Sequence, residues 1–99
     1  MAEASARRSG DTVQVHGELD FDSVARLWEA TETLFQAAEP VCCIDLGGVQ
    51  HSNSAGVALM VEWLGQARRR QWPLRFVNVP RQMRAIIEVA DLETVLPLA

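Results

Sequence analysis

The chain has 99 residues, 48% of them apolar, and a formal charge of −4. This length allows one domain with one hydrophobic core. The acidic balance argues against binding duplex nucleic acid, and no window approaches the ~18 apolar residues of a membrane span. Residues 1–10 are small and polar and lack the apolar segment of a signal peptide. We therefore expect a flexible N-terminal tail at 1–10, a single domain at 11–99 and a cytoplasmic protein.

Apolar and polar residues alternate over 11–19, which predicts one strand with a break at Gly17, or two short strands. Asp20 or Asp22 is expected to cap the helix that follows, and Pro40 to close it. Its apolar positions recur at helical spacing and form the expected core face. These positions are Val24, Leu27, Trp28, Thr31, Leu34, Phe35 and Ala38.

The run 41–46 is continuously apolar, which is typical of a strand buried on both faces. Gly47 and Gly48 predict a turn after it. A second helix is expected from near Ser54 to about Arg70.

A further buried strand is predicted at 73–79, and Pro80 suits the first turn of a third helix. The core stripe of that helix is expected at Met83, Ile86, Ile87 and Ala90. Residues 91–98 predict a last turn or short helix. The alternation of strands and helices predicts an α/β fold with a mainly parallel sheet of about four strands, backed on one face by three to four helices.

The second helix carries more apolar residues than one core-facing stripe needs. With Leu64 at the centre of that stripe, Trp63 lies about 100° away and Leu59 about 140° away. Ala55 lies on the same ridge, one turn earlier. Two explanations remain open at this point: Trp63 covers the core edge or a neighbouring helix, or the ridge is exposed and docks a partner.

Ser52, Asn53 and Ser54 precede the second helix, where one of them is expected to cap it and the others to fill the turn. A phosphate on a hydroxyl at a helix N-terminus is tolerated by the helix but would repel an apolar partner. Cys42 and Cys43 are adjacent in a strand, so they point to opposite faces and are expected to stay reduced. We expect no catalytic residues, no metal site and no cofactor.

Three segments together resemble a STAS domain, and the resemblance covers about residues 11–98. They are GELDFDSVARLWE, IDLGGVQHSNSAGVALMVEWL and VPRQMRAIIEVADL. The resemblance implies a single domain with a mixed sheet backed by helices. In the anti-sigma factor antagonists of this family, a phosphorylatable Ser stands at the helix start, and Ser54 matches it. Asn53 replaces the Asp that usually precedes this Ser.

Within the family, the chain is most similar to the STAS subunits of bacterial Mla phospholipid-transport ABC complexes. This similarity implies a non-catalytic accessory subunit that binds the ATPase subunit, and through it the membrane permease, and that supports assembly and activity. The subunit would be cytoplasmic and peripheral to the inner membrane, without nucleic acid or a direct membrane span. The expected partner-binding residues are Ser52, Asn53, Ser54, Ala55, Leu59 and Trp63. The alternative is an anti-sigma factor antagonist switched by phosphorylation of Ser54.

Overall fold

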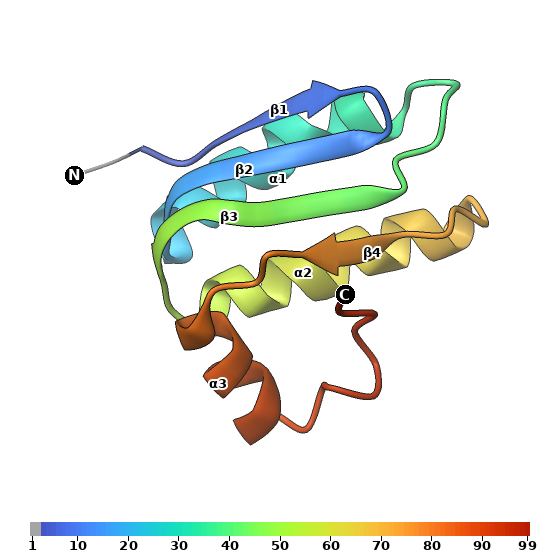
Figure 1. Ribbon diagram of the computed structural model, residues 1–99. Coiled ribbons are helices and arrows are strands. Elements are labelled where there is room, and N and C mark those ends of the chain that lie inside the picture. The colour runs from blue at the N-terminus through green and yellow to red at the C-terminus, as the bar shows by residue number, and fades with distance from the viewer. Residues whose placement is uncertain (1–2) are drawn as a thin grey trace.

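Residues 3–99, the part of the chain that the computed structural model describes, form four strands and three helices, which alternate after β1 (Figure 1). They are β1 (Ser5–Ser9), β2 (Thr12–Leu19), α1 (Phe21–Phe35), β3 (Cys43–Ser52), α2 (Ser54–Arg69), β4 (Arg75–Val77) and α3 (Arg81–Val89). The order in the sheet is β1-β2-β3-β4, with β1 antiparallel to β2 and the other pairs parallel. This confirms the predicted α/β fold with a mixed, mainly parallel sheet.

The two long helices, α1 and α2, lie behind the sheet in Figure 1, and α3 lies beside the start of α2. Gln82 on α3 accepts a hydrogen bond from the backbone N–H of Ser52 at 3.0 Å, which ties α3 to the end of β3. The core lies between the sheet and the helices. No helix within residues 3–99 is long and apolar enough to cross a membrane.

The predicted N-terminal tail is wrong for the described residues, because Ser5–Ser9 form the edge strand β1. Gly10, with φ of 64°, makes the turn into β2. The Arg8 guanidinium donates to the carbonyl oxygens of Leu34 and Pro40, which joins this edge to the end of α1. The part of the tail prediction that concerns residues 1–2 lies outside the described residues.

The predicted turn at Gly47 and Gly48 is also wrong, because β3 runs through both glycines. A side chain at position 48 would collide with the imidazole of His16 on β2, which occupies the space that a Cβ would need. The prediction that this strand is buried on both faces is wrong as well. Ile44 is buried, whereas Asp45 on the open face of the sheet is only half-buried.

Asp20, one of the two expected caps, is the N-cap of α1, and the helix ends at Phe35, well before Pro40. Ala38 is therefore outside the helix and exposed. On α3, Met83 and Ile87 are buried as predicted, but Ile86 is half-buried and Ala90 is exposed.

Gly17 does not divide β2, but its φ of +101° lies where the register with β3 is irregular. The strand β4 (Arg75–Val77) is shorter than the predicted 73–79 at both ends. Residues 91–96 form turns, and Leu98 then forms a bridge to Phe76 on β4.

Candidate functional site: the start of α2

The start of α2 is fixed by Asn53, which is its N-cap. The Asn53 Oδ1 accepts a hydrogen bond from the backbone N–H of Ala55 at 2.8 Å. An Asn at this place satisfies one of the N–H groups that a helix leaves unpaired. Ser54 is therefore the first helical residue and not the cap, and its side chain is exposed. Its hydroxyl makes no hydrogen bond to any other residue of the described chain.

Ser52, which we expected to contact a partner, has a buried side chain that is only 1% exposed. Its hydroxyl donates to the carbonyl oxygen of Asn53 at 2.9 Å and lies against Gly56. A Cβ on Gly56 would collide with that hydroxyl and would lie 3.1 Å from Leu19. Ser52 thus packs the junction of β3 and α2, and the expectation that it reaches a partner is wrong.

The interpretation of Leu59 and Trp63 as an exposed ridge is wrong, because they are 4% and 0% exposed. The Trp63 Nε1 donates to the Thr31 hydroxyl of α1 at 3.0 Å. The helix α2 packs against both the sheet and α1, so its buried surface is wider than one stripe. The alternative explanation, that Trp63 covers a neighbouring helix, is the one that the structure supports.

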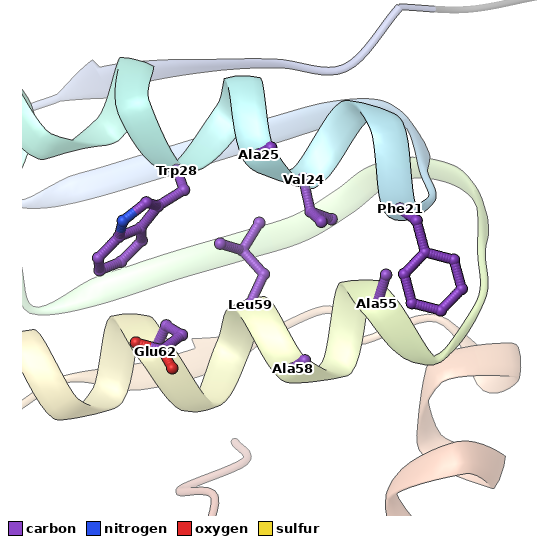
Figure 2. Close-up of a pocket in the computed structure, with 8 residues that line it drawn as sticks. All are labelled: Phe21, Val24, Ala25, Trp28, Ala55, Ala58, Leu59 and Glu62. Atoms are coloured by element: carbon purple, nitrogen blue, oxygen red, sulfur yellow. The ribbon is translucent and has the colours of Figure 1, made fainter.

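A groove of about 320 Å³ lies along the outer side of the contact between α1 and α2 (Figure 2). Ala55 and Leu59 of the expected site line it, although both are largely buried. Phe21, which is 72% exposed, stands near Ala55 at one end, and Trp28 and Glu62 lie at the other. The lining residues, which we call the α1/α2 groove, are Phe21, Val24, Ala25, Trp28, Ala55, Ala58, Leu59 and Glu62.

A second apolar hollow lies on the α3 side of Ser54 and has a volume of about 420 Å³. Its lining includes Ile86 and Val89 of α3, and Val89 is 90% exposed. We call Ser54, Ile86 and Val89, together with Ala85 and Ala90, the Ser54 surface. Ser54 lines this hollow and its neighbour Ala55 lines the α1/α2 groove, so the first two residues of α2 each border an apolar surface.

The α1 side of this region carries a capped, acidic helix start. The Asp20 carboxylate accepts hydrogen bonds from the backbone N–H groups of Ser23 (2.8 Å) and Asp22 (3.0 Å). The hydrogen bond from Ser23 is the main reason why the pKa of Asp20 lies below its usual value. In return, the backbone N–H of Asp20 donates to the Ser23 hydroxyl at 2.9 Å, which completes a capping box.

Within residues 3–99, no three His, Cys, Asp or Glu side chains come together in a way that could hold a metal ion. Cys42 and Cys43 are free and half-buried, and burial raises the pKa of the Cys43 thiol. A raised pKa disfavours the reactive thiolate.

Sequence reasoning missed Phe21 and Val89 and assigned Val24 and Trp28 to the core. A signal for the groove was present, because Phe21, Val24, Ala25 and Trp28 follow the spacing i, i+3, i+4, i+7. This stripe lies beside the buried stripe of α1, and the sequence pattern alone does not separate the two.

Residues 2–97 match the family model described as "Mlab, STAS domain". Over 63 residues the chain is 35% identical to the intermembrane phospholipid transport system binding protein MlaB of Escherichia coli (strain K12), and equally to that of Shigella flexneri. These alignments cover 64% of this chain and 62% of each relative, so they span less than two thirds of the relatives' length.

Two solved structures share the fold. The anti-sigma factor antagonist SpoIIAA in its unphosphorylated form superposes with a TM-score of 0.69 at 15% identity, covering 97% of this chain and 86% of that one. An anti-sigma-factor antagonist (STAS) domain protein from Planctomyces limnophilus gives a TM-score of 0.74 at 19% identity, covering 100% of this chain and 90% of that one. At these identities the likeness concerns the fold alone.

Proposed function

The chain belongs to the STAS domain family, and from this membership we propose that it is a non-catalytic accessory subunit of a phospholipid-transporting ABC complex. It binds the ATPase subunit, contacts the permease only through that subunit, and supports assembly and activity of the complex. This role holds it at the cytoplasmic side of the inner membrane. The names of its relatives in E. coli and S. flexneri, which belong to a phospholipid transport system, support the proposal.

The observation that carries the proposal is the exposed Ser54 beside an apolar hollow, with the next residue, Ala55, lining the α1/α2 groove. Protein interfaces commonly combine a desolvated apolar centre with a few polar groups that fix the register. Phe21 and Val89 supply apolar area that the fold itself leaves in water. Ser54 supplies a donor and an acceptor that a partner can use.

The surroundings of Ser54 favour docking over catalysis. A nucleophilic Ser needs a general base within hydrogen-bond reach. Inside residues 3–99, no His, Asp or Glu side chain forms a hydrogen bond with the Ser54 hydroxyl. The hollow beside it is lined by alanine and aliphatic side chains, which perform no acid–base chemistry.

Affinity purification of the tagged chain from membranes of its own host tests this proposal. We expect mass spectrometry to identify an ABC ATPase and a permease as the main co-purified proteins, and the Ser54→Asp variant to lose both. Recovery of a soluble kinase together with a sigma factor would overturn the proposal. In that case, wild-type protein from the host would also carry a phosphate that Ser54→Ala lacks.

A further inference from the structure

We infer that the α1/α2 groove is a second docking site, which receives a basic amphipathic helix of the ATPase subunit. The inference rests on the proposed function, because the helix belongs to that complex. It concerns a surface separate from the exposed Ser54 hydroxyl. The helix would place two apolar side chains in the groove and an Arg or Lys beside Glu62.

The shape of the groove fits a helix. The residues from α1 and those from α2 follow the same spacing, i, i+3, i+4, i+7, so each wall runs over two helical turns, about 10 Å. Figure 2 shows the walls side by side, with Phe21 and Ala55 at one end. Ala25 and Ala58 are too small to fill the space between the helices, and this leaves the hollow. A third helix packs into such a space with side chains one turn apart.

The groove is not required by the core of the domain. The contact between the two helices is already filled by Leu59 and Trp63, which are buried. Phe21, the first residue of α1, is mostly in water. The fold therefore gains little from burying this aromatic side chain, whereas a partner that covers it would bury most of its apolar area.

The charge of the groove selects the partner. Glu62 is the only charged residue among the eight that line it, and it lies at the same end as Trp28. Glu62 forms no ion pair with any other residue of the described chain. A cation at this end would meet a carboxylate and an aromatic face together, an arrangement that favours Arg. A carboxylate of a partner would be repelled at this end.

The experiment measures the affinity of the purified chain for the purified ATPase subunit of the same organism. Ala58→Phe fills the groove and Glu62→Arg reverses its charge; both residues are exposed, so both variants should fold. We expect each to weaken binding by about tenfold or more. The matched controls outside the groove are Ala30→Phe on α1 and Glu93→Arg after α3. Their affinity for the ATPase subunit should stay within about twofold of the wild-type value.

A charge scan of the ATPase completes the test. Exposed Arg and Lys residues on its helices are changed to Glu one at a time, and one such change should restore binding to the Glu62→Arg variant. The inference is overturned if no change restores it, or if the groove variants bind like wild type. If Ser54→Asp abolishes binding while the groove variants keep it, the groove inference fails and the proposed function stands. If the wild-type chain does not bind the ATPase, the proposed function fails, and the inference fails with it.

Discussion

At the scale of single residues, Trp63 and Thr31 form a polar contact that is buried between α1 and α2. The Trp63 indole donates to the Thr31 hydroxyl at 3.0 Å, and this hydroxyl lies 2.9 Å from the carbonyl oxygen of Leu27, to which it donates. Both side chains have no exposed surface. Neither group could find a water molecule in place of its partner without a rearrangement of the core.

The Thr31→Val variant keeps the shape of the side chain and leaves the indole N–H unpaired, so the free energy of unfolding should fall by about 1–3 kcal/mol. Adding Trp63→Phe removes the unpaired donor. The double variant should therefore lose less stability than the sum of the single variants, with a coupling of about 1 kcal/mol. Urea denaturation of all four proteins measures this coupling, and strictly additive losses would contradict it.

Asn53 and Ser54 are neighbours with different tasks, because only Asn53 caps α2. Replacing Asn53 with Ala should lower the free energy of unfolding by about 1 kcal/mol. Replacing the exposed Ser54 with Ala should change it by less than about 0.5 kcal/mol. Denaturant unfolding of the two variants checks that Asn53 is the cap. A larger loss of stability for Ser54→Ala than for Asn53→Ala would show that the cap is misassigned.

At the scale of elements, α2 contains two glycines with opposite surroundings. A Cβ on Gly65 would meet only the flexible end of Arg69, at 3.9 Å, whereas a Cβ on Gly56 would collide with the Ser52 hydroxyl. Helix propensity favours Ala over Gly at both positions by about 1 kcal/mol. The space around each glycine therefore decides whether replacement by Ala raises or lowers the free energy of unfolding.

We predict that Gly65→Ala raises the free energy of unfolding by about 0.5–1 kcal/mol. We predict that Gly56→Ala lowers it by about 1–3 kcal/mol, because Ser52 and Leu19 would have to move. Thermal and urea unfolding of the two variants provide the comparison. Stabilisation by both substitutions would mean that the junction of β3 and α2 is looser than described.

The Asp20 carboxylate at the start of α1 should make the free energy of unfolding depend on pH in the acid range. The backbone hydrogen bond from Ser23 lowers the pKa of Asp20 in the folded chain. The contribution of this carboxylate is therefore complete above the pKa of Asp in the unfolded chain, and it is lost as the pH falls through the folded pKa. Asp20→Asn keeps a capping oxygen but does not titrate there, so the stability difference between wild type and variant should shrink on acidification. A difference that stays constant across that range would contradict the assignment.

The helices could be predicted from the sequence because their signals are local. Apolar spacing and caps place α2 within a residue of its observed ends. The strand β1 could not be predicted, since its polar sequence becomes a strand only through pairing with β2. For the same reason, the burial of Trp63 depends on Thr31, which is 32 residues away in the chain. Ser54 could be placed at a helix start, but Phe21 and Val89 emerged as surface residues only when the helices were packed.

At the scale of the whole molecule, the Ser54 surface and the α1/α2 groove each include one residue from the start of α2, Ser54 and Ala55 respectively. Three helices contribute to these two surfaces, and their most exposed large apolar side chains are Phe21 and Val89. A partner that covers both surfaces would contact α1, α2 and α3 together. Docking should therefore depend on the native packing of the helices as well as on the contact residues.

The most direct test of docking through the start of α2 is the affinity of the purified ATPase subunit for wild type and for Ser54→Asp. An anion at a helix N-terminus is favourable, so the unfolding temperature of the variant should match that of wild type. A charge placed at the edge of the apolar Ser54 surface must be desolvated when the partner docks, so we predict a loss of affinity of about tenfold or more. Equal affinity of the two proteins for the ATPase would contradict the proposed docking surface.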